Sequence, residues 1–171
     1  SDLGFQHDPA LSEVFDVRYE LPSICAQQVA AVQADIGILP VIETARQKLD
    51  YFPGTGIACH GPVRTILLIS KVPYAQIRTL AVDTGSRTSV MLSRVILAER
   101  FGATPTVFAR KADMETMLAE ADACLIIGDP ALHIDPENIP YACLDLGGEW
   151  VNMTGLPMVF AVWSARKELI Q

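Results

Sequence analysis

The chain has 171 residues, which is enough for one domain or for two small lobes with a substantial buried core. Half of the residues are hydrophobic and the mean hydropathy is +0.29, values that exclude an intrinsically disordered chain. The net charge of −7 and the pI near 4.8 argue against nucleic acid and anionic membrane surfaces as partners, and the longest apolar runs are too broken to span a membrane.

The spacing of the cysteines and histidines matches neither a metal site nor a disulfide framework. Cys25, Cys59, Cys124 and Cys143 lie in or beside apolar runs, where a free thiol packs as a small hydrophobic group. We therefore expect no bound metal and a reducing, cytoplasmic location.

The first part of the chain is predicted to contain a strand at 15–19, a helix from about 23 to 33 with Ser23 as a candidate cap, and a buried strand at 35–40. A helix from 41 to about 50 follows, and its charged residues Glu43, Arg46 and Lys48 are expected on a solvated outer face. Another apolar strand is predicted at 66–69, after a glycine–proline step that begins at Gly61.

The stretch 79–102 is the most informative part of the sequence. An apolar strand at 80–82 leads into a turn with four hydroxyl side chains, and apolar residues then recur at helical spacing up to Gly102, a predicted helix stop. The unpaired N–H groups and the positive dipole end of such a helix attract an anion. A helix cap needs one hydroxyl, so the four hydroxyls of Thr84, Ser86, Thr88 and Ser89 favour an anion site over a plain cap.

Strands at 106–109 and 124–127 with a helix at 113–120 between them continue the strand–helix alternation, which predicts parallel strands covered on both faces. The carboxyl ends of such strands meet at one edge, where Asp129 would act as an acid/base group or cap the next turn. A last strand is predicted at 158–163 and would return the chain to the part that contains the first strands. Crossings near 71–79 and 152–157 then predict two lobes around a hinged cleft.

Seven strings of the sequence stand in the order found in the chorismate dehydratase family, and the resemblance covers nearly the whole chain. They are Leu21-Pro-Ser, Asp35-Ile-Gly-Ile-Leu-Pro40, Gly61-Pro-Val-Arg-Thr65, Asp83-Thr-Gly-Ser-Arg-Thr-Ser89, Ile127-Gly-Asp-Pro-Ala-Leu132, Asp145-Leu-Gly-Gly-Glu-Trp150 and Thr154-Gly-Leu-Pro157. The resemblance implies an α/β fold similar to type II periplasmic binding proteins, with a ligand cleft between two lobes. We expect a first lobe of 1–77 and 155–171 and a second of 78–154. The family's first strand, with an asparagine that is a candidate catalytic residue, would precede Ser1, and its last helices would follow Gln171.

The resemblance also implies a function. A hydro-lyase of this kind is a carbon–oxygen lyase that removes water from chorismate, a dianion, to give 3-[(1-carboxyvinyl)oxy]benzoate in the futalosine route to menaquinone, without metal or organic cofactor. The substrate-binding residues that the motifs imply are Thr84, Ser86, Thr88 and Ser89 at the helix start, Cys59, Gly61 and Thr65 in the opposite lobe, and Asn152 and Thr154 near the hinge. Asp129 would lie near the ring hydroxyl, and Arg87 would either neutralise substrate charge or pair with Asp83.

Other interpretations stay open at this point. One is a solute-binding protein that holds a small aromatic carboxylate without chemistry. Another is the related 1,4-dihydroxy-6-naphthoate synthase, although the Gly-Asp-Pro-Ala-Leu and Gly-Glu-Trp strings fit the dehydratase better. A third is the ligand-sensing lobe of a regulator, but the sequence shows no DNA-binding segment.

Overall fold

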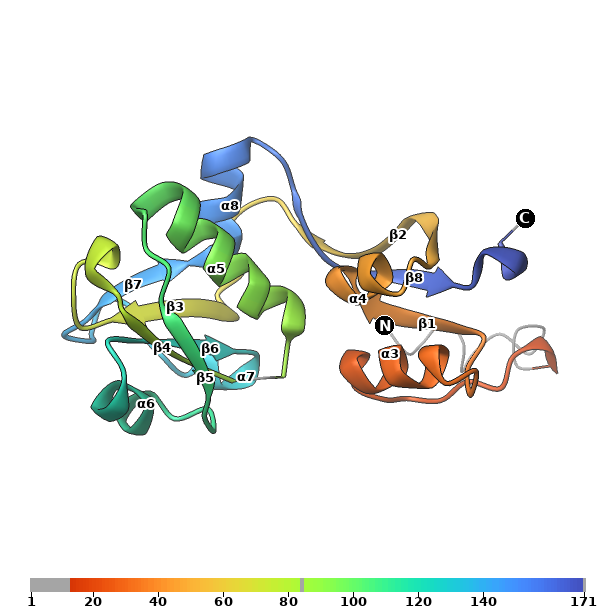
Figure 1. Ribbon diagram of the computed structural model, residues 1–171, viewed down its shortest axis with the longest axis horizontal. Coiled ribbons are helices and arrows are strands. Elements are labelled where there is room, and N and C mark those ends of the chain that lie inside the picture. The colour runs from red at the N-terminus through yellow and green to blue at the C-terminus, as the bar shows by residue number, and fades with distance from the viewer. Residues whose placement is uncertain (1–12, 84, 171) are drawn as a thin grey trace.

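The structure, a computed structural model, describes residues 13–83 and 85–170, which form two sheets with helices packed on them (Figure 1). One sheet has the strand order β1-β8-β2 and the other has the order β5-β4-β6-β3-β7. The strands are β1 (Ile36–Pro40), β2 (Asp50–Cys59), β3 (Ile66–Ser70), β4 (Thr79–Val82), β5 (Thr106–Ala109), β6 (Ala123–Ile127), β7 (Ala142–Asp145) and β8 (Met158–Ala165). The helices are α3 (Pro22–Ala30), α4 (Val41–Arg46), α5 (Arg87–Phe101), α6 (Met114–Glu120), α7 (Asp129–Leu132) and α8 (Leu146–Thr154), with short 3-10 helices at Tyr74–Gln76 and Lys167–Leu169.

The five-stranded sheet carries the larger core, because side chains alternate between its two covered faces. β4 runs parallel to β5 and β6, whereas β3 runs antiparallel to β6 and β7. Leu68 and Leu80 pack with residues of α5 and α8 on one face, and Leu67 and Ile126 pack with residues of α6 on the other. Each fully buried leucine or isoleucine contributes about 1.5–3 kcal/mol relative to its exposed state, so this two-faced core holds the sheet and its helices together.

The three-stranded sheet has β8 at its centre, antiparallel to both β1 and β2. Its core is smaller, with Ala26 and Val29 of α3 packed against Leu39 of β1. The hydroxyl groups of Thr44 in α4 and Ser164 in β8 share a buried hydrogen bond of 2.8 Å. This bond fixes α4 to the central strand of the sheet.

Two connections join the sheets (Figure 1). Residues 60–65 lead from β2 into β3, and residues 155–157 lead from α8 into β8. The first connection therefore lies before β3, and the crossing predicted near 71–79 was wrong. The expected first lobe of 1–77 would include β3, but β3 pairs with β6 and β7 of the five-stranded sheet. The apolar run at 66–69 suits a buried strand of either sheet, and only its distant partners decide between them.

Most strands follow the sequence prediction. The predicted strands that correspond to β1, β3, β4, β5, β6 and β8 are confirmed within two residues at their ends. The predicted helix stop is also confirmed, since Gly102 follows the last residue of α5 with a positive φ of 66°. The prediction of parallel strands is confirmed for β4, β5 and β6. The strand predicted at 15–19 was wrong, since residues 15–20 have no regular structure. The helix α3 begins at Pro22 without a side-chain cap from Ser23.

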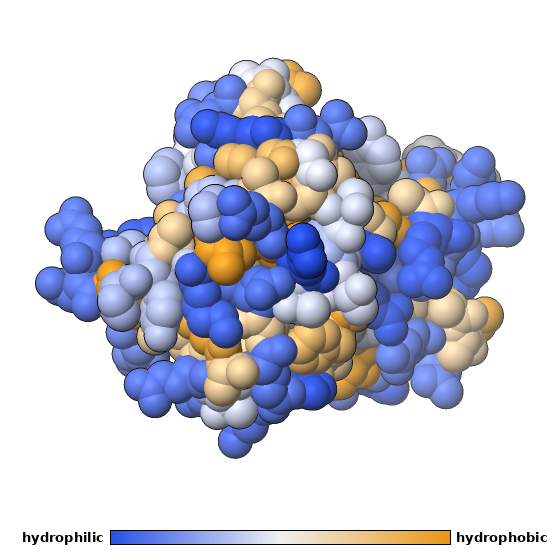
Figure 2. Space-filling model, turned by 60° about the vertical axis from the view of Figure 1, so that its left-hand side comes forward, coloured by the Kyte–Doolittle hydropathy of each residue, from blue (hydrophilic) through white to orange (hydrophobic). Residues whose placement is uncertain are grey.

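Figure 2 shows one face of the surface, on which hydrophobic residues form separate patches bordered by hydrophilic ones. Exposed apolar side chains such as Met91, Val95 and Leu132 are distributed over α5 and α7. Within 13–83 and 85–170, no helix combines the length and the apolar character needed to cross a membrane.

Candidate functional site

The first turn of α5 has a hydroxyl cap, which was the alternative to the anion site that the sequence favoured. Ser86 has an extended backbone, and its side chain accepts the backbone N–H of Ser89 at 3.3 Å. The hydroxyl oxygens of these two serines lie 2.9 Å apart in a hydrogen bond. Ser86 is therefore a helix cap, and Ser89 supports it from the third helical position. Thr84, the first hydroxyl of this turn, lies outside the described residues.

The backbone of this turn still offers donors. The N–H groups of Arg87 and Thr88 belong to the first helical turn, where an α-helix supplies no partner of its own. Among the described residues, neither amide donates a hydrogen bond to another group. These two amides and the positive end of a 15-residue helix dipole make the turn capable of holding a carboxylate.

Thr88 turns its side chain towards the other sheet rather than to a ligand. Its hydroxyl donates to the carbonyl oxygen of Phe160 in β8 at 3.2 Å, and the residue is buried. The expected role of Thr88 in substrate binding therefore applies to its backbone amide, because its hydroxyl joins α5 to the three-stranded sheet.

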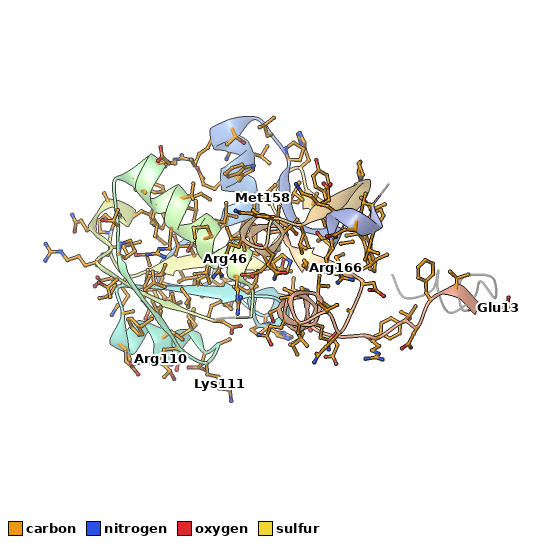
Figure 3. All side chains as sticks on the ribbon, turned by 45° about the vertical axis from the view of Figure 1, so that its right-hand side comes forward. Glu13, Arg46, Arg110, Lys111, Met158 and Arg166 are labelled. Atoms are coloured by element: carbon orange, nitrogen blue, oxygen red, sulfur yellow. The ribbon has the colours of Figure 1, made fainter. Side chains whose placement is uncertain are left out.

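An ion pair between a buried carboxylate and an exposed arginine joins the two sheets beside this turn. The oxygen Oε1 of Glu43 in α4 lies 2.9 Å from Nη1 of Arg87 in α5. The same oxygen lies 3.0 Å from Nη1 of Arg46 in its own helix. The Glu43 side chain is only 6% exposed, so the prediction of a solvated outer face was wrong for this residue. Arg87 pairs with Glu43 and not with Asp83, which instead accepts the N–H of Gly85. Figure 3 labels Arg46, the last residue of α4.

Burial and the neighbouring arginines shift the pKa of Glu43 in opposite directions. Burial acts most strongly and by itself raises the pKa, but the hydrogen bond and charge of Arg87, with the charge of Arg46, together lower it below the ordinary value of 4.5. The carboxylate is therefore ionised at neutral pH and stays paired.

The second group of expected residues surrounds the connection 60–65. Cys59 ends β2, and the carbonyl group of Thr65 accepts the N–H of Gly128 at 2.8 Å. Gly61 has a φ of 149°, a backbone angle that side chains disfavour. A Cβ atom on Gly147 of α8 would stand 3.0 Å from the Cys59 sulfur and the Gly61 carbonyl oxygen, so α8 needs a glycine there to pack on the connection.

The Asp145-Leu-Gly-Gly-Glu-Trp150 string acts as a clamp on this connection. The Asp145 carboxylate caps α8 by accepting the N–H of Gly148 at 3.0 Å, and it also accepts the N–H groups of Val63 at 3.0 Å and Arg64 at 2.7 Å. Glu149, which is buried, pairs with Arg100 of α5. The string therefore fixes α8 to the connection on one side and to α5 on the other.

The remaining expected residues are exposed and lie at helix ends. Thr154 donates its hydroxyl to the carbonyl oxygen of Trp150 at 2.8 Å and accepts the N–H of Leu156, so it closes the end of α8. Asn152 is exposed on the same helix, and Asp129 is exposed at the first residue of α7. Neither residue makes a hydrogen bond to another expected site residue within the described part of the chain.

The expected residues thus fall into two groups. Ser86, Thr88 and Ser89 gather at the start of α5 against α4 and β8, whereas Cys59, Gly61 and Thr65 follow the connection beside α8. In the described ranges, no hydrogen bond joins the two groups. A hollow of about 590 Å³ lies beside the connection 60–65, and its lining includes Pro62, Arg64, His133, Asp135, Cys143 and Asp145. None of the expected site residues lines it.

Nothing in residues 13–83 and 85–170 groups three or more His, Cys, Asp or Glu side chains in a metal-binding arrangement. Sequence reasoning missed the Glu43–Arg87 pair and the clamp by Asp145. The i, i+3 spacing of Glu43 and Arg46 on a helix is a signal that could have shown the ion pair within α4, but no local pattern points from Glu43 to a residue 44 positions later.

Comparison with known proteins agrees with the resemblance in the sequence. The model of a family described as menaquinone biosynthesis matches residues 4–171. The chain is 33% identical over 138 residues to chorismate dehydratase of Thermus thermophilus, in an alignment that covers 72% of this chain and 50% of that protein, so the chain spans about half of the relative's length. The crystal structure of protein AF1704 from Archaeoglobus fulgidus shares the fold, with a TM-score of 0.60 over 90% of this chain and 57% of that one at 16% identity. On the match over residues 4–171, the chain belongs to the menaquinone biosynthesis family.

Proposed function

We propose that the protein is a chorismate dehydratase, a carbon–oxygen lyase that acts in menaquinone biosynthesis through the futalosine route. Membership of the menaquinone biosynthesis family and the 33% identity to a protein of that name support this activity. The observation that carries the proposal is the first turn of α5, where the amides of Arg87 and Thr88 stand without partners among the described residues beside the paired serines. An acidic protein needs such local donors to hold a dianion against its own long-range field.

The site contributes to this reaction mainly by positioning the substrate. A ring proton and the ring hydroxyl of chorismate leave together as one water molecule, and the electrons of the broken C–H bond complete the aromatic ring. Because aromatisation is favourable, the main task is to select this elimination over loss of the enolpyruvyl group. Donors that fix the carboxylates and orient the ring serve that selection.

Within this proposal, the residues have separate roles. The amides of Arg87 and Thr88 and the hydroxyls of Ser86 and Ser89 bind one substrate carboxylate. A substrate carboxylate rather than a protein base takes the ring proton, and Asp129, which follows the carboxyl end of the central strand β6, acts near the departing hydroxyl. Cys59, Gly61, Thr65, Asn152 and Thr154 shape the connections rather than touch the reacting atoms.

We further propose that the two sheets are the lobes of a fold similar to type II periplasmic binding proteins, with the ligand cleft at the start of α5. The lobes divide at the connections 60–65 and 155–157, which moves β3 into the second lobe relative to the expected division. The described cysteines are all free thiols, which suits a reducing cytoplasm.

Substitution of Ser89 by alanine tests the carboxylate site. We expect Ser89→Ala to weaken chorismate binding by ~1–3 kcal/mol, the contribution of a hydrogen bond to a charged group. Ser86→Ala should weaken binding to a similar extent and also lower stability by about 1 kcal/mol, because it removes the helix cap. Isothermal titration calorimetry and urea unfolding measure the two effects.

Ser93→Ala is the matched control. Ser93 lies one turn further along the same helix, is fully buried, and donates its hydroxyl to the carbonyl oxygen of Val90 at 2.8 Å, so it bonds neither the amides of Arg87 and Thr88 nor the two serine hydroxyls. Chorismate affinity should be the same in Ser93→Ala as in the unaltered protein. Unchanged affinity in Ser86→Ala and Ser89→Ala as well, with the fold intact, would leave the turn a plain helix cap.

A further inference from the structure

The ion pair between Glu43 and Arg87 does more than neutralise one buried charge, because it also links the two sheets. A carboxylate with so little exposure needs a cationic partner, since an unpaired buried charge is strongly destabilising. Arg46 already supplies such a partner from the same helix at 3.0 Å. Arg87 is a second cation on the same oxygen, and it comes from the other sheet. The charge of Glu43 is therefore satisfied locally, and the contact with Arg87 adds a link between the sheets.

This link acts on the same backbone as the proposed carboxylate site. Arg87 is the first residue of α5, directly after the cap Ser86, and its amide is one of the two donors of the turn. The next residue, Thr88, donates its hydroxyl to the carbonyl oxygen of Phe160 in β8. Two successive residues of the first turn are thus bonded to the three-stranded sheet, one through α4 and one through β8.

The link also lies apart from the covalent connections. Residues 60–65 and 155–157 join the sheets beside α8, whereas the first turn of α5 meets the other sheet at α4 (Figure 1). A structure held only at two connections on one side is free to hinge about them, as two-lobed proteins do. A contact on a different side restrains that hinge.

We propose that Glu43 and Arg87 form an inter-sheet latch that positions the first turn of α5 against the three-stranded sheet, with Arg87 as a positioning residue for the carboxylate site. The use of the latch in substrate binding rests on the proposed function, but the latch itself is a property of the fold. Arg87 acts through its bond to Glu43, which holds the helix start, and its guanidinium does not contact the substrate.

The chain offers a matched pair of variants. Arg46 and Arg87 both bond Oε1 of Glu43, but only Arg87 bridges the sheets. In the full-length protein, spin labels on unnatural side chains at the exposed positions Tyr51 and Leu132, one in each sheet region, report the distance between the regions by pulsed electron paramagnetic resonance. We expect Arg87→Ala to broaden and lengthen this distance distribution, Arg46→Ala to leave it unchanged, and Arg87→Lys to restore most of it.

Steady-state kinetics with chorismate provide the second readout. We expect Arg87→Ala to raise KM about tenfold, because the latched arrangement falls to about a tenth of the molecules, with kcat much less affected. Arg46→Ala should change KM less than about twofold, since the link between the sheets stays. Arg87→Lys should recover most of the loss, which a merely destabilised variant would not do.

The two readouts separate the latch from the proposed function. A distance distribution that is the same in Arg87→Ala and in the unaltered protein would overturn the latch, whatever the kinetics show. Equal broadening in Arg46→Ala and Arg87→Ala would also overturn it, because the effect would then follow from the loss of charge on Glu43 alone. If the unaltered protein does not turn over chorismate, the proposed function fails, while the distance measurement still decides on the latch. Should Arg87→Ala not fold, Arg87→Gln takes its place with the same expected broadening.

Discussion

Replacing Asp145 with alanine is expected to destabilise the protein more than the loss of an ordinary helix cap. The carboxylate accepts the N–H groups of Gly148, Val63 and Arg64, the last two from the connection between the sheets. Loss of the cap on α8 costs about 1 kcal/mol. Loss of the half-buried bond from Val63 to a charged acceptor costs about 1.5 kcal/mol more, whereas the exposed N–H of Arg64 turns to water. The total is about 2–3 kcal/mol, or a fall in Tm of roughly 5–10 °C.

Asp113→Ala is the control for this measurement. Asp113 caps α6 by accepting the N–H of Thr116 at 2.8 Å, is exposed, and accepts no backbone N–H from a distant segment of the described chain. Its loss should therefore lower the free energy of unfolding by less than the loss of Asp145 does, because only a helix cap is removed. Urea unfolding followed by circular dichroism gives both values. If the two variants lose the same stability, Asp145 is a plain cap, and the reasoning that it fixes the connection is refuted.

Two further predictions follow from packing and burial. Gly147→Ala should cost about 1–3 kcal/mol in urea unfolding, because its Cβ would stand 3.0 Å from three atoms, whereas Gly85→Ala, with no contact under 3.5 Å, should stay within about 0.5 kcal/mol of the unaltered protein. Burial, and then the neighbouring Cys143, raise the pKa of the Cys124 thiol to about 12 from 9.0, so the stability from its neutral form is complete below pH 9.0 and is lost as the pH rises towards 12. The unfolding free energy of Cys124→Ala should accordingly fall less steeply over this range; an equally steep fall would assign the alkaline loss to other groups.

The sequence patterns predicted the elements that depend on local signals. The strand β4, the helix α5 and its stop at Gly102 follow from an apolar run, apolar residues at helical spacing and a glycine. The strand β2 was not predicted, because Pro53, Gly54 and Gly56 interrupt any alternation, and its pairing with β8 goes through two register shifts. Such a strand depends on its partner rather than on its own sequence.

The helix α8 was missed for a related reason. Gly147 and Gly148 indicate a flexible link when read locally, since glycine disfavours helix. In the fold, the absence of side chains at these positions lets the helix approach the connection closely, and Asp145 starts the helix. The same limit applies to Glu43: its helical position indicates an exposed charge, whereas in the fold its carboxylate is buried between Arg46 of its own helix and Arg87 of the distant α5. Long-range pairing decided each of these cases.

Incubation of the full-length protein with chorismate, followed by chromatography with ultraviolet detection, tests the central claim most directly. The proposed function predicts that chorismate disappears and that 3-[(1-carboxyvinyl)oxy]benzoate appears in equal amount, at a rate that falls in Ser89→Ala and not in Ser93→Ala. Recovery of unchanged chorismate, or of only 4-hydroxybenzoate at the uncatalysed rate, would contradict it.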